Sequence, residues 1–296
     1  MTIGICGTGK MGSAMAVRLM DVGETVAVWN RTASRAQPLA DKGAALVASP
    51  VALLDRCDVV IVMLIDDAAV RDVYEGDDGL LSADFGDTLF IEMSTVLPKT
   101  TQDLAGKVQA RGGAFVECPV GGTVAPALNG QLLGMIGGEA GDVERARPVL
   151  DQLCRRTDHV GPVGSGTAMK LAINLPVIVY WQALGEALSF AEKAGVDREV
   201  AADLLGESSG AARVAQLFLP GILEALDNDP PPSSAFEITG ALKDLDLMFE
   251  YAASAGIDVP SITSVRPSYQ AAAQDGWGDA DFPFLTAWLV RRLGQR

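Results

Sequence analysis

The stretch IGICGTGKMGSAMAVRL near the start of the chain constrains the fold more than any other. It places Gly7, Gly9 and Gly12 in the spacing GxGxxG, after a run of strand type and at the start of a helix-like segment. The first glycine permits a tight turn, the second lets backbone approach a pyrophosphate, and the third lets helix and strand pack closely. A second strand-like run follows at 25–29, so the motif predicts dinucleotide binding; the alternative is a purely structural turn. The residues predicted to hold the dinucleotide here are Gly7, Gly9, Lys10, Met11 and Gly12.

The end of the second predicted strand indicates which dinucleotide is preferred. Sites for NAD usually offer an acidic residue there to bind the ribose 2′-hydroxyl, whereas this chain reads Trp29, Asn30, Arg31, Thr32, with Arg35 one turn later. A guanidinium would attract a 2′-phosphate and can bind its oxygens in pairs. We therefore expect Asn30, Arg31 and Thr32 to bind NADPH (NADP+), with some tolerance of NADH. The alternative is that both arginines belong to a solvated helix start.

Hydrophobic patterning divides the chain into two parts. Through the first 160 residues, strand-like runs alternate with helical segments, which predicts a parallel, doubly wound α/β sheet of Rossmann type. The runs are 3–6, 25–29, 58–64, 87–93, 113–118 and 132–138, with helices expected at 10–21 and 97–111. Beyond that, the stretches 170–195, 198–208, 235–255 and 282–293 are helical in composition. We predict a nucleotide-binding domain at 1–162 and an all-helical domain for substrate and dimerisation at 163–296, joined by a long interdomain helix.

Charge and residue usage exclude several classes of function. The net charge of −15 would repel nucleic acids and anionic membranes. The four cysteines are scattered and His159 is the sole histidine, so neither a disulfide framework nor a metal site is predicted. A cytoplasmic location is expected. The apolar stretch 171–190 contains several polar residues and is interpreted as an interior helix rather than a membrane span.

The segment GSGTAMKLAINL places a cation and an amide on this apolar helix. Lys170 and Asn174 are four residues apart and therefore share one face. An ammonium buried without a partner is costly, so Lys170 should lie in a cleft or contact a partner, although it could also extend to solvent. Its position where the two predicted domains join favours a small-molecule site.

These residues resemble the β-hydroxyacid dehydrogenase family, which includes 3-hydroxyisobutyrate dehydrogenase and semialdehyde reductases and is related to imine reductases. The resemblance runs through GTGKMGSAMA, MLIDDAAVRDV, IEMSTVLP, ECPVGGTVAPALNGQL, GSGTAMKLAIN and ITGALKDLDL. It implies a homodimer or homotetramer with a substrate cleft between its domains. It also implies that Lys170 exchanges the proton with the substrate oxygen and that Asn174 orients the substrate.

The resemblance assigns further residues to cofactor and substrate. Met63 and Leu64 match positions along the adenosine and ribose groove. Thr95, next to Ser94, and Lys243 match positions near the nicotinamide. The turn formed by Gly121, Gly122 and Thr123 matches the turn that binds the substrate carboxylate, together with Lys170 and Asn174.

This substrate turn departs from the family pattern. The family usually reads Pro-Val-Ser-Gly-Gly, whereas Gly121 here lacks the serine hydroxyl, and Pro126 replaces a common glycine. Losing one hydrogen bond weakens binding by about tenfold to a hundredfold, so a carboxylate substrate is disfavoured but not excluded. Thr123 could supply a substitute hydroxyl, or Gly121 could make room for a larger carbonyl compound.

Together these features predict an NADPH-preferring oxidoreductase that interconverts a small aldehyde or 3-oxo acid and its β-hydroxy acid or alcohol. Two alternatives remain open. One is an imine reductase on the same fold, against which Lys170 argues. The other is a noncatalytic NADPH-binding module, against which the presence of Lys170, Asn174 and Lys243 argues.

Overall fold

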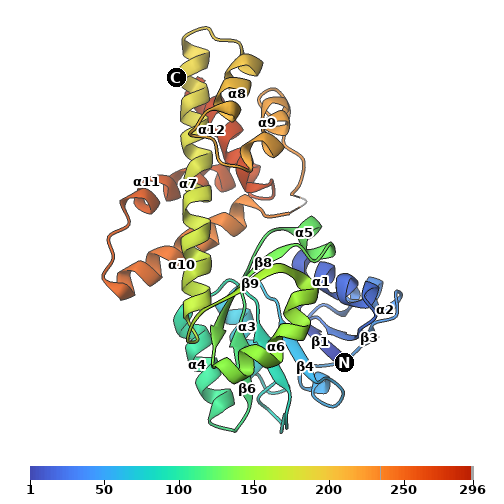
Figure 1. Cartoon of the computed structure of the whole chain (residues 1–296). Coiled ribbons are helices and arrows are strands. Elements are labelled where there is room, and N and C mark those ends of the chain that lie inside the picture. Colours follow the sequence, from blue (N-terminus) through green and yellow to red (C-terminus); the bar gives the residue numbers. More distant parts are fainter. Residues whose placement is uncertain (234, 295–296) are drawn as a thin grey trace. The chain divides into compact units, whose positions relative to one another are not determined.

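The computed structural model describes residues 1–233 and 235–294 (Figure 1). They form two compact units, Met1–Leu171 and Ala172–Arg296, each with its own buried side chains. The first unit contains the sheet, and the second is built from helices.

The sheet of the first unit confirms the predicted Rossmann-type architecture. Its main path runs in the order β3-β2-β1-β4-β5-β6-β8-β7, and β9 pairs with β8. The strands from β3 to β6 are all parallel. Their bounds are Thr2–Cys6 (β1), Thr25–Trp29 (β2), Ala45–Leu46 (β3), Val59–Val62 (β4), Leu89–Glu92 (β5), Ala114–Glu117 (β6), Val120–Gly121 (β7), Leu132–Gly138 (β8) and Cys154–Gly161 (β9).

One predicted strand pairs differently from the rest. The run 132–138 forms β8 as predicted, but β8 lies antiparallel to β6 and is therefore no part of the parallel array. Between these strands lie the two-residue strand β7, which pairs antiparallel with β8, and the short helix α5, Val124–Leu128. The chain accordingly returns in the opposite direction.

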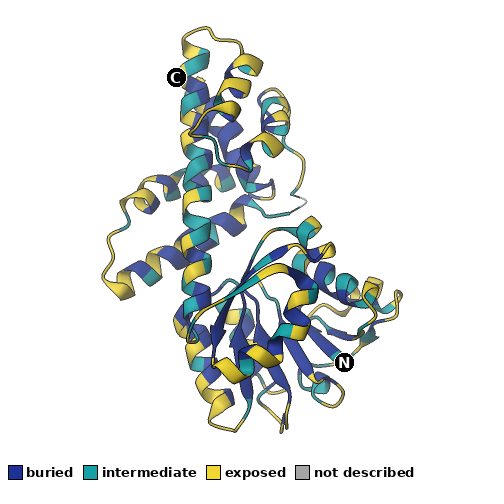
Figure 2. Ribbon diagram, in the orientation of Figure 1, coloured by how far each residue is buried: buried dark blue, intermediate teal, exposed yellow. Residues whose placement is uncertain are grey.

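Helices cover both faces of this sheet (Figure 2). One apolar cluster joins Ile3 and Ile5 to side chains of α1 (Lys10–Asp21) and α6 (Ala140–Leu153). The other joins Val60 and Phe90 to α3 (Asp67–Glu75) and α4 (Pro98–Gln109). Strands β4, β5 and β6 are buried along their whole length, as expected for a sheet covered on both faces. The short segments α2 (Gln37–Ala40), η1 (Ala33–Arg35) and η2 (Val51–Leu53) complete this unit.

The second unit confirms the predicted helical character. Its helices are α7 (Ser165–Lys193), which begins before the unit boundary, α8 (Arg198–Glu207), α9 (Ala215–Glu224), α10 (Ile238–Ala255), α11 (Pro260–Ala272) and α12 (Leu285–Gly294). The short segments η3 (Ala273–Trp277) and η4 (Phe282–Phe284) precede α12. Helices α9 and α11 were not predicted; each contains an internal proline, Pro220 and Pro267, although proline usually ends a helix.

Helix α7 is a core element of the second unit. Trp181 is fully buried and contacts Phe218 and Phe282 edge to face, with ring centroids 5.6 and 6.1 Å away. Thr286 donates a hydrogen bond to the Trp181 carbonyl at 2.7 Å. Among the described helices α7 is long and apolar enough to cross a membrane, but a core helix of a water-soluble unit passes the same test.

Candidate functional site

The glycine loop after β1 has the geometry that its motif predicted. Gly7 has φ +104°, and its N–H donates to the Trp29 carbonyl at 2.9 Å, which fastens the loop to the end of β2. A Cβ atom at Gly7 would collide with the Met63 carbonyl, and one at Gly12 would collide with the Gly7 carbonyl. A Cβ at Gly9 would meet no described atom within 4 Å. The first and third glycines are therefore required by the fold, whereas Gly9 leaves open space beside the backbone.

The start of α1 offers backbone N–H groups to an anion. Gly9 is the N-cap residue, and no side chain caps this end of the helix. The first N–H groups of a helix have no partner within it, and the helix dipole favours negative charge there. Such an end is suited to a pyrophosphate.

A pocket of about 150 Å³ lies beside this loop in the first unit. It brings together seven predicted residues from the ends of β1, β2 and β4, and adds others that the sequence did not indicate. The predicted ones are Gly7, Gly9, Asn30, Arg31, Thr32, Met63 and Leu64; the additional ones include Ile65, Ala69, Asp72 and Val73. These last three lie on α3, whose role only the folded chain reveals.

Lys10, Met11 and Gly12 do not line this pocket. Lys10 is exposed at the first position of α1, Gly12 is buried against the loop, and Met11 packs partly against the apolar core. Their place in the motif is thus at the helix start rather than in the pocket.

The cationic side of the pocket is built at the end of β2. Arg31 and Arg35 are exposed, and within the described residues neither forms an ion pair. Asn30 is fixed between two backbone groups: its Oδ1 accepts from the Thr8 N–H at 3.1 Å and its Nδ2 donates to the Thr32 carbonyl at 3.0 Å. Arg31 and Arg35 thus line the same pocket as the glycine loop, together with the acid Asp72.

The turn after β5 is held by a buried carboxyl group. Glu92 is wholly buried, and its Oε1 accepts from the Ser94 N–H at 2.9 Å. The Ser94 hydroxyl accepts from the Leu64 N–H at 2.9 Å, which joins this turn to the end of β4. Burial raises the pKa of Glu92 to about 8, so its neutral form is favoured below that pH. Thr95, predicted near the nicotinamide, is half-buried on the same turn.

The first turns of α7 carry Lys170, which is half-buried. The start of this helix contacts Glu117, the last residue of β6, through backbone and side-chain hydrogen bonds. Glu117 was not among the predicted site residues. A signal was present, because an acid ends an otherwise apolar strand in AFVE.

Asn174 lies one turn further along α7, already within the second unit, and it contacts another residue of that unit. Its Nδ2 donates to Asp244 Oδ2 at 2.7 Å. The Lys243 ammonium forms an ion pair with Asp244 Oδ1 at 2.8 Å. Asp244 is almost wholly buried on α10, so it fixes the amide of Asn174 and the ammonium of Lys243 together.

The turn predicted to bind a carboxylate follows β7. Gly122 has φ +124°, which favours glycine, whereas Gly121 has no such constraint. A Cβ at Gly121 would lie 3.6 Å from the Leu133 Cβ, an ordinary contact. Thr123 precedes α5, and its hydroxyl does not cap that helix. The missing serine at Gly121 is therefore not a consequence of crowding.

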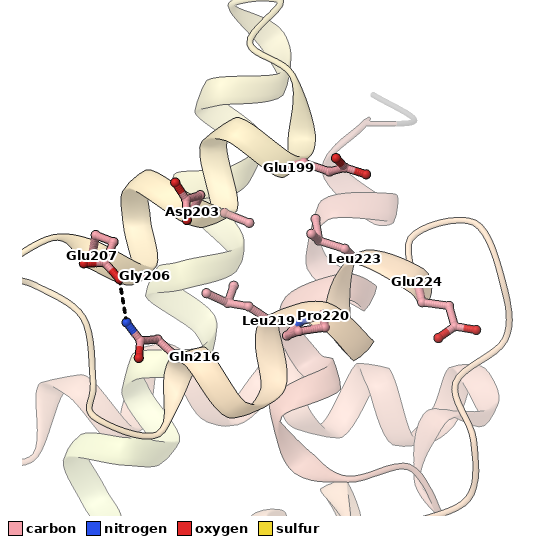
Figure 3. A pocket seen from close by; sticks show the side chains of 10 residues that line it. Glu199, Asp203, Gly206, Glu207, Gln216, Leu219, Pro220, Leu223 and Glu224 are labelled. Carbon is pink, nitrogen blue, oxygen red and sulfur yellow. Dashed lines mark hydrogen bonds between the residues drawn. The ribbon is translucent and has the colours of Figure 1, made fainter.

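A larger hollow of about 680 Å³ lies between α8 and α9 in the second unit, and none of the predicted site residues lines it (Figure 3). Its lining includes the acids Glu199, Asp203, Glu207 and Glu224. Gln216 donates to Glu207 at 2.9 Å. Such a lining would repel an anionic substrate or a phosphate. We therefore regard the nucleotide pocket and the Lys170 region, not this hollow, as the candidate active site.

Comparison with known proteins agrees with this geometry over nearly the whole chain. Residues 2–161 match the model of the NAD binding domain of 6-phosphogluconate dehydrogenase. Residues 164–289 match the model described as NAD-binding of NADP-dependent 3-hydroxyisobutyrate dehydrogenase. The chain belongs to the β-hydroxyacid dehydrogenase family. It is an NAD(P)-dependent dehydrogenase or reductase of the hydroxyacid dehydrogenase type.

Relatives in this family cover both of its units. Glyoxylate/succinic semialdehyde reductase 1 of Arabidopsis thaliana is 32% identical over 95% of this chain and 96% of its own. The structure of Mycobacterium tuberculosis 3-hydroxyisobutyrate dehydrogenase with L-serine has a TM-score of 0.85 at 30% identity, covering 97% of this chain and 98% of that one. That of Psf3 with NADP+ and 2-OPP also has a TM-score of 0.85, at 26% identity, covering 97% and 99%.

Imine reductases share the family fold with this chain. An imine reductase from Pseudomonas sp. has a TM-score of 0.63 at 21% identity, over 97% of this chain and 99% of that one. Identity at this level shows a common fold and nothing about the reaction.

Proposed function

We propose that this enzyme is an NADPH-preferring oxidoreductase that interconverts a small aldehyde or 3-oxo acid and the corresponding alcohol or β-hydroxy acid, with Lys170 as proton donor and acceptor. The observation that carries the proposal is the position of Lys170 and Asn174 one turn apart on α7, with the Asn174 amide fixed by Asp244 at 2.7 Å. A fixed amide and a half-buried ammonium on one helix face can hold a carbonyl oxygen and supply its proton.

The preference for NADPH rests on the end of β2. Arg31 and Arg35 line the nucleotide pocket at the position where an acid would bind a ribose 2′-hydroxyl. A 2′-phosphate would form charge-assisted hydrogen bonds with these guanidinium groups. NADH lacks that phosphate and would leave them in water, so it should bind more weakly without being excluded.

Lys170 and Asn174 have separate roles in the proposed reaction. When bound, the nicotinamide cofactor supplies a hydride to the carbonyl carbon or accepts one in the reverse direction. The Lys170 ammonium donates a proton to the carbonyl oxygen, so that the product is a neutral alcohol. In the reverse direction the neutral amine of Lys170 accepts the hydroxyl proton. Asn174 orients the oxygen, and Asp244 keeps the Asn174 amide in place.

The substrate class follows from the turn at Gly121, Gly122 and Thr123. Backbone N–H groups in a turn with a positive φ at Gly122 can bind an anion. The relatives include a glyoxylate/succinic semialdehyde reductase and 3-hydroxyisobutyrate dehydrogenases, whose names describe small carbonyl or hydroxy acids. We infer that the substrate is a small carbonyl compound that carries a carboxylate, bound more weakly than a serine at position 121 would allow.

The proposal is tested by following NADPH and, separately, NADH oxidation at 340 nm. The substrates are glyoxylate, succinic semialdehyde, an uncharged aldehyde and a cyclic imine. Wild type is compared with Lys170→Ala and with Lys42→Ala, which removes an exposed lysine of the first unit as a matched control. Aldehyde-dependent oxidation that collapses only in Lys170→Ala supports the proposed reaction. Activity confined to the imine, or equal in both variants, would contradict it.

A further inference from the structure

A buried carboxylate accepts hydrogen bonds from the start of α7. Glu117 is the last residue of β6 and has no exposed surface. Its Oε1 accepts from the N–H groups of Gly164 and Gly166, each at 2.7 Å, and from that of Thr167 at 3.3 Å. Its Oε2 accepts from the Thr167 hydroxyl at 2.6 Å. One side chain thus satisfies four donors from a segment about 50 residues further along the chain.

The surrounding backbone is shaped to admit this carboxylate. A Cβ at Gly137 would collide with Glu117 Oε1, and one at Gly166 would lie 3.1 Å from the same oxygen. Gly164 has φ +99°, a conformation that favours glycine, where the chain turns into the helix. Three glycines therefore permit a contact that most side chains at these positions would block.

The contact compensates charges that burial would otherwise make costly. A carboxylate without hydrogen bonds is strongly disfavoured inside a protein. The first N–H groups of α7 lack partners within the helix, and the helix dipole places partial positive charge at this end. Glu117 and the start of α7 therefore satisfy one another, and the attachment is directional because both oxygens are used.

Lys170 lies close to this attachment. It follows Thr167 by three residues, which is less than one turn and about 4.5 Å along the helix axis. Since a helix is stiff over one turn, the orientation of Gly166 and Thr167 determines where the Lys170 side chain begins. A small rotation at the start of α7 would move the ammonium away from its reacting position, and misplacement of about 1 Å can cost a hundredfold in rate.

We propose that Glu117 is a positioning residue for Lys170: by binding Gly164, Gly166 and Thr167 it fixes the first turn of α7 and thereby the location of the proton donor. The inference rests on the proposed function for the role of Lys170. It assigns Glu117 no contact with substrate or cofactor, so it acts on the rate rather than on nucleotide binding.

Two pairs of variants separate positioning from general stability. Thr167→Val removes the hydroxyl donor at nearly the same volume, whereas Thr167→Ser retains it. Glu117→Ala removes the acceptors, whereas Glu117→Gln keeps Oε1 for the backbone and offers an amide N–H₂ to the Thr167 hydroxyl oxygen. Each full-length variant is measured for kcat and KM, for NADPH affinity by fluorescence titration, and for hydrogen exchange in the 164–172 peptide.

We expect kcat to fall by about tenfold to a hundredfold in Thr167→Val, because one charge-assisted hydrogen bond is lost, and further in Glu117→Ala. NADPH affinity should stay within about twofold of wild type, since the nucleotide pocket is formed elsewhere in the first unit. Thr167→Ser should retain most of kcat, and Glu117→Gln, which keeps an acceptor but loses the charge, should lose less than Glu117→Ala. Exchange in 164–172 should accelerate only in the two damaging variants.

The outcomes are distinct from those of the proposed function. Unchanged kcat and unchanged hydrogen exchange in Thr167→Val would overturn the inference. Both can be measured in Thr167→Val even if Glu117→Ala does not fold. A parallel loss of kcat and NADPH affinity in Thr167→Val would also overturn it, because that indicates general destabilisation. If Lys170→Ala keeps full activity, the proposed function fails. Labelling of the Lys170 amine by acetic anhydride then tests positioning directly, and equal labelling rates in wild type and Thr167→Val refute it.

Discussion

Replacing Glu92 by glutamine should remove a pH dependence from the stability of the first unit. Glu92 is wholly buried at the end of β5, where only its Oε1 has a hydrogen-bond donor, the Ser94 N–H at 2.9 Å. Among the described residues its Oε2 has no hydrogen-bond partner. Ionising such a group inside the fold is costly, so the native chain favours the neutral acid.

The sign of the effect follows from the direction of the pKa shift. Burial raises the pKa of Glu92 from 4.5 to about 8; hydrogen bonds from Ser94 oppose the rise, whereas Glu117 and Asp67 add to it. Between these two values the native chain holds a proton that the unfolded chain has lost. The stabilisation is therefore fully present below pH 4.5 and is lost as the pH rises towards about 8.

The magnitude follows from the same shift. Each pH unit in this window corresponds to about 1.4 kcal/mol for one proton. From roughly pH 5.5 to roughly pH 7.5, the free energy of unfolding should therefore fall by about 2 to 3 kcal/mol through Glu92 alone. Glutamine has the same shape and no charge to gain, so Glu92→Gln should lose this slope.

The assay must report on the first unit separately, because a chain of two compact units need not unfold in one step. Urea unfolding is therefore followed by pulsed hydrogen exchange in peptides from β4 and β5, at several pH values across the window. Glu139→Gln, at an exposed glutamate before α6, is the matched control. Other groups that titrate in this range cancel in the comparison with wild type.

Parallel curves would refute the reasoning. If wild type and Glu92→Gln lose stability equally as the pH rises, Glu92 is not protonated in the native state. If the free energy of unfolding of wild type instead rises with pH relative to Glu92→Gln, the native pKa of Glu92 is lowered by its partners. Such a result would contradict the argument that burial raises it.

The remaining predictions concern the cofactor and substrate sites. Arg31→Ala should raise KM for NADPH by about tenfold to a hundredfold and leave NADH kinetics nearly unchanged, because only the 2′-phosphate loses a partner; equal effects on both cofactors would contradict this role. Gly121→Ser should lower KM for succinic semialdehyde by about tenfold without affecting an uncharged aldehyde, since Cβ has room there and the hydroxyl can bind a carboxylate; identical KM values for both substrates would exclude it. Gly9→Ala should keep the melting temperature but weaken NADPH binding, because a Cβ at Gly9 meets no described atom. Gly12→Ala should lower the melting temperature, because its Cβ would collide with the Gly7 carbonyl. A lower melting temperature in Gly9→Ala than in Gly12→Ala would contradict this assignment.

Local patterns in the sequence predicted most of the elements. The buried strands β1, β2, β4, β5 and β6 are short apolar runs, and α1 was predicted with its observed bounds, Lys10–Asp21. Failures occurred where the outcome depends on distant partners. The direction of β8 follows from its pairing with β6, and α9 continues through Pro220 because its apolar face is buried against the rest of the second unit.

The same distinction applies to the candidate site. The glycine loop and the arginines after β2 form a local motif, and Gly7, Gly9, Arg31 and Arg35 line one pocket. The supporting acids were missed because their partners are far along the chain. Asp244 lies in the segment ITGALKDLDL but was given no role there, because its contact with Asn174 spans 70 residues.

Two buried glutamates at adjacent strand ends illustrate how surroundings, not residue type, assign a role. Glu92 and Glu117 are paired in register on β5 and β6, and both are completely buried. Glu117 accepts four hydrogen bonds from the start of α7, whereas Glu92 accepts from Ser94 among the described residues and is favoured as a neutral acid below about pH 8. Two neighbouring charges would repel each other in this environment, so neutrality of Glu92 protects the attachment that Glu117 makes. Ionising Glu92 above about pH 8 should thus weaken the start of α7 through repulsion between the two carboxylates, although the ionised group still accepts from Ser94. Amide exchange is intrinsically faster at high pH in every variant, so lower protection of 164–172 in wild type than in Glu92→Gln at the same high pH would demonstrate this coupling.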